Sequence, residues 1–204
     1  MLVTPVTLAG TTVRLEPLRI EHVPALCAAG LHPELWRWIP IRVRTEGDMR
    51  QYVEAALADG AAGRALPFAT LDAGTGEVIG STRYGAIEPA HGRLEIGWTW
   101  LTPGRLRTRA NTEAKFLMLR HAFETLGCGR IELKTDALNE RSRAAIARLG
   151  ATPEGIFRRH LVCDDGRVRD TAWFSVIADE WPRVKASLEA RLAPRQPACA
   201  PAIS

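Results

Sequence analysis

Residues 93 to 150 contain the pattern that most restricts how this chain folds. A run of strand-forming residues, Arg93 to Leu101, precedes an amphipathic helical pattern from Asn111 to Leu126, and Gly127 follows as a helix C-terminal cap would. A second strand-forming run, Arg130 to Thr135, leads into another helical pattern from Asn139 to Leu149. The order strand, helix, strand, helix predicts a crossover unit, and therefore a fold that mixes helices with a sheet.

The N-terminal half predicts further strands beside this unit. Val13 to Leu18 alternates apolar and polar side chains, as a half-buried strand does. A short helix is expected between Arg19 and Gly30, and Thr45, with Asp48 three residues later, has the spacing of a helix N-cap. Two strand-forming runs followed by turn signals, together with Arg93 to Leu101, predict an antiparallel meander. These two runs are Leu66 to Asp72 and Glu77 to Glu88.

The C-terminal part predicts a hairpin and a last helix. Thr152 to Val162 and Val168 to Ile177 are strand-forming and flank an Asp-Gly turn. A helical pattern runs from about Asp179 to Leu192. We expect one domain over residues 1–192, and a mobile tail over residues 193–204, which are rich in Pro and Ala.

Composition excludes several classes of protein. With 46% hydrophobic and 25% charged residues, the 204-residue chain has the balance of a soluble globular protein, and no apolar run approaches a membrane span. The N-terminus has no basic segment followed by an apolar block, so we expect a cytoplasmic protein without a membrane partner. The four cysteines are scattered and form no CxxC, so neither a disulfide framework nor a metal site is indicated.

The basic residues gather at one place that suits an anion. The net charge is only +4, but Arg105, Arg107 and Arg109 fall within five residues, immediately before the helix that starts near Asn111. A helix start offers unpaired N–H groups to a pyrophosphate. The alternative is an ordinary solvated loop. Neither a P-loop motif nor GxGxxG is present, and aromatic residues do not interleave with the arginines, so no nucleic-acid partner is expected.

Five sequence segments, in this order and spacing, resemble one known family. The segments are LEIGWTWL, NTEAKFLMLRHAF, ELKTDALNERSRAAIARLGA, EGIFRRH and DGRVRDTAWFS. They are similar to the GNAT acyl-CoA-dependent N-acetyltransferases, and most to the branch of Rim-type enzymes that acetylate the N-termini of ribosomal proteins. The resemblance extends from Val13 to about Leu192. It implies an α/β (α+β) fold with a mixed, twisted sheet of about seven strands flanked by helices, and a V-shaped splay between the fourth and fifth strands, Arg93 to Leu101 and Arg130 to Thr135.

The resemblance implies acetyl-CoA as co-substrate, bound in the splay, and no metal. In the family the pantetheine arm pairs with the end of the first splayed strand, and the pyrophosphate lies on the loop and helix start that follow. The matching cofactor-binding residues here are Trp98, Thr99, Trp100, Leu101, Arg107, Thr108, Arg109, Ala110, Asn111, Thr112, Asn139 and Ser142. Arg109 stands where the family has a glycine. Either its guanidinium binds a phosphate oxygen directly, or the loop is displaced and cofactor affinity falls.

Acyl transfer to an amine needs a base, a donor for the developing oxyanion and an acid for the departing thiolate. Glu95, beside the expected splay, is a candidate base, with a solvated strand carboxylate as the alternative. Asp136, after the other splayed strand, competes for that role, with a turn-forming Asp as the alternative. Asn139 and Ser142 each suit a helix cap. The resemblance places Asn139 beside the pantetheine and Ser142 near the sulfur as thiolate acid, because neither Tyr52 nor Tyr84 matches the family's tyrosine.

The acceptor is expected near an early loop. Trp36 and Trp38 suit an acceptor pocket, although core packing explains each equally well. We therefore expect an N-acetyltransferase that moves an acetyl group directly from acetyl-CoA to a primary amine, either a protein N-terminus or a small-molecule or antibiotic amine. The alternative is an acyl-CoA-binding module with little or no catalysis. A monomer or a homodimer is consistent with the sequence.

Overall fold

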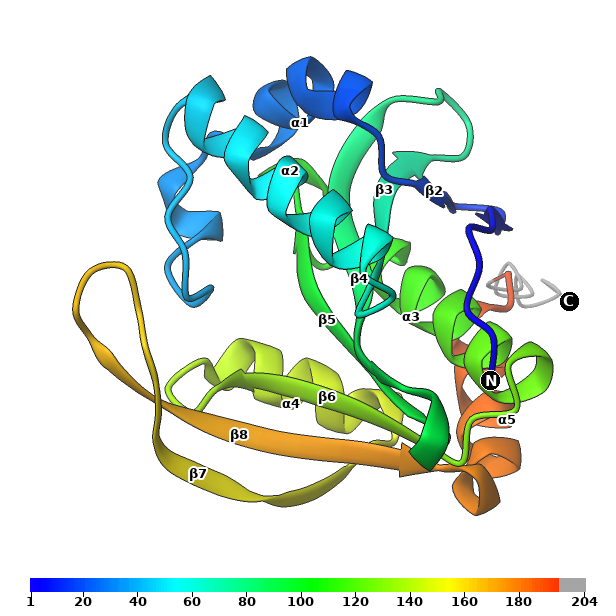
Figure 1. Ribbon diagram of the computed structural model, residues 1–204. Helices are drawn as coiled ribbons and strands as arrows, with labels where there is room; N and C mark the ends of the chain where they lie inside the picture. The colour runs from blue at the N-terminus through cyan, green and yellow to red at the C-terminus, as the bar shows by residue number, and fades with distance from the viewer. Residues whose placement is uncertain (195–204) are drawn as a thin grey trace, which may run out of the picture.

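The computed structural model of the protein describes residues 1–194 and contains one eight-stranded sheet (Figure 1). The strand order is β1-β2-β3-β4-β5-β6-β8-β7. The strands are β1 (Leu8–Ala9), β2 (Val13–Pro17), β3 (Leu66–Asp72), β4 (Val78–Glu88), β5 (Arg93–Leu101), β6 (Arg130–Asp136), β7 (Thr152–Val162) and β8 (Val168–Ile177). The sequence predicted seven of them and missed β1, whose two residues are too short for any alternating pattern. Of the predicted mobile tail, residues 195–204 lie outside the described residues.

The sheet is antiparallel except at one place, the pairing of β5 with β6. Their parallel ladder contains only three residue pairs, Arg93 with Arg130, Leu94 with Ile131 and Glu95 with Glu132. Beyond Glu95 the two strands separate, while β5 stays paired with β4 and β6 with β8 (Figure 1). The crossover unit, the meander and the V-shaped splay are therefore confirmed.

Helices cover both faces of the sheet. The helices are α1 (Val23–Gly30), α2 (Glu46–Ala61), α3 (Ala110–Arg120), α4 (Glu140–Leu149) and α5 (Trp181–Leu192). Buried side chains of α1 and α2 pack on one face in a cluster with Trp36 and Trp100. Those of α3, α4 and α5 pack on the other face around Leu94 and Ile131. None of the helices in the described range is long and apolar enough to cross a lipid bilayer.

Local sequence signals explain where the helices begin and end. The Thr45 hydroxyl accepts the Asp48 N–H at 3.1 Å, and the Asp48 carboxylate accepts the Thr45 N–H at 3.0 Å, which forms the predicted capping box of α2. The predicted helix to Leu126 is also present, but it changes at His121 into one π-helical turn, His121–Thr125. Gly127 follows with φ +68°, as a C-terminal glycine does.

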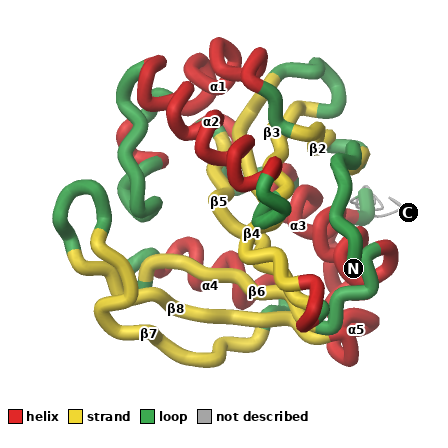
Figure 2. The backbone as a smooth tube through the Cα atoms, viewed as in Figure 1, coloured by secondary structure: helices red, strands yellow, loops and turns green. Residues whose placement is uncertain are grey.

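Two segments far apart in the sequence meet at the open end of the splay. The loop between α1 and α2 lies against the turn of the β7–β8 hairpin, as Figure 2 shows. Asp164 donates its N–H to the Pro40 carbonyl at 2.9 Å and accepts that of Arg42 at 3.1 Å. The hairpin therefore forms one wall of the region in front of β5 and β6.

Candidate active site

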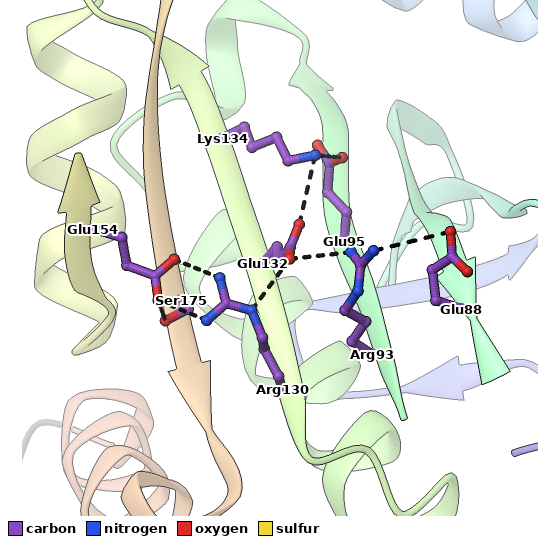
Figure 3. Close-up of polar contacts among 8 residues, drawn as sticks. All are labelled: Glu88, Arg93, Glu95, Arg130, Glu132, Lys134, Glu154 and Ser175. Carbon is purple, nitrogen blue, oxygen red and sulfur yellow. Dashed lines mark hydrogen bonds and ion pairs between the residues drawn. The ribbon is translucent and has the colours of Figure 1, made fainter. Parts of the chain in front are cut away.

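The closed end of the splay is held by charged side chains on β5 and β6 (Figure 3). Arg93 Nη1 lies 3.2 Å from Glu132 Oε1, across the last paired residues. Lys134 Nζ lies 2.9 Å from Glu95 Oε2 and 3.6 Å from Glu132 Oε2. Because the parallel ladder ends at Glu95, the Lys134–Glu95 ion pair bridges the strands where they start to separate. It fixes the Glu95 carboxylate at the vertex of the splay.

The same network continues outward to the edge strand. Arg130 Nη1 donates to Glu154 Oε1 at 2.6 Å, and the Ser175 hydroxyl donates to the same oxygen at 2.8 Å (Figure 3). The hydrogen bonds from Arg130 lower the pKa of Glu154, with a smaller contribution from Ser175. These contacts tie β6, β8 and β7 together on the side of β6 away from β5.

Two local features of β5 shape the region next to Glu95. A Cβ on Gly97 would lie 2.6 Å from Glu95 Oε1. Because Gly97 has no side chain, there is room for the Glu95 carboxylate. At Trp98 the backbone is left-handed, with φ +54°, and the ladder with β4 skips from Gly97 to Trp100. A bulge of this kind leaves backbone groups outside the ladder and redirects the strand.

The predicted anion site lies at the start of α3, and two of its three arginines bind different partners within the protein. Arg105 binds Asp72 at 2.7 Å. Arg109 donates to the carbonyls of Leu192 and Ala193, at 3.2 and 2.8 Å, so its guanidinium caps the end of α5. A direct contact of this guanidinium with a phosphate stays a prediction, and it would compete with these two hydrogen bonds.

Arg109, which stands where the family has a glycine, does not need the backbone freedom of glycine. Its backbone is right-handed, with φ −69°, and the left-handed position is Arg107, with φ +62°. The Thr108 hydroxyl accepts the Ala110 N–H at 3.2 Å. The first amide that donates within the helix is that of Glu113, to the Arg109 carbonyl at 2.9 Å, so the amides of Asn111 and Thr112 before it are donors of the kind that a helix start presents to an anion. Arg107, between Arg105 and Arg109, is exposed.

Asn139, Ser142 and Asp136 lie around the start of α4. The Asn139 side chain accepts the Ser142 N–H at 3.0 Å, so Asn139 caps the helix and Ser142 occupies its first turn. Asp136 is buried and lies 2.7 Å from an Arg167 nitrogen, and its other oxygen accepts the Leu138 N–H at 2.9 Å. Asp136 thus holds the hairpin and the turn before α4.

The two tryptophans of the early loop differ. Trp36 is 2% exposed, packs against Tyr52 and Trp100, and donates to the Gly30 carbonyl at 2.8 Å. The expectation that Trp36 lines an acceptor pocket is corrected, because its ring lies in the core. Trp38 is half-buried, and its carbonyl accepts a hydrogen bond from Arg169 at 3.3 Å.

Two lysines near the vertex were not singled out from the sequence, because their partners are distant along the chain. Lys134 Nζ lies 3.8 Å from the centre of the Trp173 ring as well as beside Glu95. Lys115, on α3, is 6% exposed, donates to the Thr99 hydroxyl at 2.5 Å and takes part in none of the ion pairs among residues 1–194. Burial lowers the pKa of Lys115 to about 7, although nearby Glu95 opposes the shift.

Histidine 160 on β7 also faces this region. Its ring contacts Trp173 edge to face, and Nδ1 lies 3.0 Å from the Thr171 hydroxyl. Burial lowers the pKa of His160, and Lys134 and Arg169 lower it further. A neutral imidazole at pH 7 is therefore expected beside the Lys134–Glu95 pair.

The splay and the helix start are the features expected from the resemblance to N-acetyltransferases, and comparisons with known proteins agree with that resemblance. A model of the acetyltransferase (GNAT) domain matches residues 12–152. A GCN5-related N-acetyltransferase from Brucella melitensis is 36% identical, with 94% of this chain and 87% of that chain covered and a TM-score of 0.86. The uncharacterized N-acetyltransferase p20 of Bacillus licheniformis is 27% identical over 179 residues, which is 86% of this chain and 98% of p20.

Rim-type enzymes are also among the structural neighbours. Mycobacterium smegmatis RimJ in complex with CoA-disulfide is 27% identical, with 92% of each chain covered and a TM-score of 0.77. RimL, a ribosomal L7/L12 alpha-N-protein acetyltransferase, shares the fold at 21% identity and a TM-score of 0.74. The chain belongs to the GNAT acetyltransferase family, and the protein is an acetyltransferase.

Proposed function

We propose that this acetyltransferase moves an acetyl group from acetyl-CoA directly to a primary amine. The observation that carries the proposal is the end of the β5–β6 ladder at Glu95, with the Trp98 bulge and the start of α3 following on the same strand and its loop. An amine acceptor in front of Glu95 would meet an acyl group held along the open edge of β5. The alternative of a binding module without catalysis is distinguished by the experiment below.

The residues at the open edge fit acetyl-CoA. The amides of Asn111 and Thr112 and the exposed side chain of Arg107 suit a diphosphate. From Trp98 to Leu101, one edge of β5 lies along β4, and the other edge, toward β6, is beyond the end of the β5–β6 ladder. This second edge suits the amide groups of a pantetheine arm. When bound, acetyl-CoA supplies the acetyl group in activated form, as a thioester.

Glu95 is the proposed base. An amine attacks only when it has lost its proton, so a carboxylate at the vertex, acting directly or through one water, takes the proton of the acceptor. Lys134 orients that carboxylate, and Gly97 leaves room for it. Asp136 is less suited to this role, because Arg167 and the Leu138 N–H already engage its oxygens.

Ser142 is the proposed acid. It lies in the first turn of α4, and its backbone N–H is already bound to Asn139, which fixes the residue while its hydroxyl remains a donor. In this proposal the hydroxyl, or a water in its place, returns a proton to the departing thiolate. Asn139 contributes by holding this turn and by contacting the pantetheine.

Two measurements test the proposal. Calorimetric titration with acetyl-CoA is expected to show binding that weakens with salt, because an anion binds at the helix start. Release of free CoA thiol with a panel of primary amines is expected to require Glu95, so Glu95→Gln lowers kcat by about 10²-fold or more while the Kd for acetyl-CoA is unchanged. Failure to bind acetyl-CoA would refute the proposal. Binding without thiol release for any amine would favour the binding module.

A further inference from the structure

A buried arginine on β4 lies beside this site, and the chemistry proposed above does not use it. Arg83 is 5% exposed, a degree of burial that arginine rarely shows unless it is paired. Its guanidinium lies 4.6 Å from the centre of the Trp98 ring and 5.2 Å from that of Tyr52. Since both rings stack against its faces, the N–H donors of Arg83 are directed edgewise and held in a fixed orientation.

The positive charge of Arg83 is not matched by a carboxylate of its own. Asp59 Oδ2 lies 4.0 Å from Arg83 Nη1, beyond hydrogen-bond distance, whereas Asp59 Oδ1 accepts two hydrogen bonds from Arg64, at 2.7 and 3.1 Å. Two guanidinium groups therefore share one carboxylate. Within the described part of the chain, the buried Nε of Arg83 has no hydrogen-bond partner. The buried guanidinium of Arg83 thus keeps hydrogen-bonding capacity that the described part of the chain does not use.

Arg83 lines a cavity whose wall also includes Gly85, the ladder partner of the candidate base Glu95. The cavity has a volume of about 250 Å³, and its walls include Asp59, Arg64, Arg83, Glu88 and Trp98. Arg83 is the ladder partner of Gly97, the residue over which the Glu95 carboxylate lies. Because neighbouring strands are only about 4.8 Å apart, a small molecule can place one group at Glu95 and another at Arg83.

We propose that the Arg83 cavity is an acceptor subsite for a carboxylate. The preferred acceptor is then a primary amine that carries a carboxylate a few bonds away, such as an amino acid or a peptide with an acidic first residue. A planar guanidinium binds a carboxylate through two parallel hydrogen bonds, which suits the edgewise donors of Arg83. The position at which the amine reacts rests on the proposed function. The binding of the carboxylate to Arg83 does not depend on it.

The test uses two acceptors that differ only in charge, the peptide amides Glu-Ala-Ala-NH₂ and Gln-Ala-Ala-NH₂. Calorimetry with the full chain is expected to give a Kd about thirtyfold lower for the acidic peptide, the effect typical of a buried charge pair. Arg83→Gln is expected to bring the ratio of the two Kd values to within about twofold of unity, since only the carboxylate contact is lost. Arg83→Lys, which keeps the charge but not the fork, is expected to give an intermediate ratio.

Arg120→Gln is the matched control. Arg120 also stacks on a ring, 5.3 Å from the centre of Phe116, but it is exposed on α3, so its loss should leave the ratio unchanged. If the unaltered protein binds the two peptides equally, the inference is overturned. This measurement needs no variant, so it decides the question even if Arg83→Gln does not fold. A variant that weakens both peptides equally also overturns it. If the acidic peptide binds preferentially and no amine of the panel gives thiol release, the proposed function fails and the subsite stands.

Discussion

Lys115 should make the folded protein less stable at neutral pH, and replacing it should reveal by how much. The residue is 6% exposed, its ammonium donates to the Thr99 hydroxyl, and burial lowers its pKa to about 7, compared with 10.5 for an ordinary lysine. Each pKa unit corresponds to about 1.4 kcal/mol, so the difference of roughly 3.5 units corresponds to about 5 kcal/mol. A substitution of Lys115 also removes the hydrogen bond to Thr99, which costs about 1 kcal/mol. The expected net gain in stability is therefore about 4 kcal/mol.

The sign of the pH dependence follows from the direction of the pKa shift. Below pH 7 both the folded and the unfolded chain carry the proton, and the full penalty applies. Between pH 7 and 10.5 the unfolded chain holds a proton that the folded chain has released, so this group makes the folded state more stable as the pH rises. Lys115→Met should therefore raise the free energy of unfolding by about 4 kcal/mol at pH 6 and by about 1 kcal/mol or less at pH 9.5.

Urea denaturation followed by tryptophan fluorescence at pH 6, 8 and 9.5 measures this difference. Lys185→Met is the control, since Lys185 pairs with Glu124 at 2.8 Å on the surface and its loss should change stability by less than about 1 kcal/mol. The reasoning is refuted if Lys115→Met is less stable than the unaltered protein at every pH. A gain in stability that does not change with pH would also refute it, because the gain would then come from packing and not from the charge.

Three further substitutions test other parts of the structure. Gly97→Ala should displace the carboxylate of Glu95, because the new Cβ would lie 2.6 Å from its oxygen, so thiol release should fall while acetyl-CoA still binds in calorimetry. Arg109→Ala should lower the free energy of unfolding by about 1–3 kcal/mol through lost bonds to the end of α5, and should weaken acetyl-CoA binding less than Arg107→Ala does. Thr45→Ala should lower the free energy of unfolding by about 1 kcal/mol through the lost cap of α2, measured by urea denaturation.

Local signals in the sequence were sufficient for most of the fold. The capping box at Thr45, the Asp-Gly turn of the hairpin and the period of the helix before Gly127 each depend on neighbouring residues, and each is present in the structure. The opening of the β5–β6 ladder is different in kind. This opening depends on contacts between residues about 40 positions apart, such as Lys134 and Glu95. Its prediction therefore came from the resemblance to a known family and not from the periodicity of the sequence.

The same distinction separates the predicted from the missed site residues. The cluster at Arg105, Arg107 and Arg109 was visible as a run of charge, but the partners that divide it, Asp72 and the end of α5, are remote in the sequence. The sequence does not distinguish Arg83 from other arginines, because the two rings beside it, those of Tyr52 and Trp98, belong to other elements of the fold. A charge run predicts where cations are; only tertiary structure determines which of them remain available to a ligand.

The geometry of β5 links stability to the proposed activity. Separating two strands inside a sheet leaves backbone groups on an interior edge, and such groups require water or a ligand as partners. The network around Glu132 confines this opening to one side of Glu95, since Arg93 and Lys134 bind across the closed end. A ligand with amide groups along its length can then complete the edge beyond Glu95. The separation that is unfavourable for the sheet alone therefore leaves, next to the proposed base, an edge along which the proposed acetyl-CoA would bind.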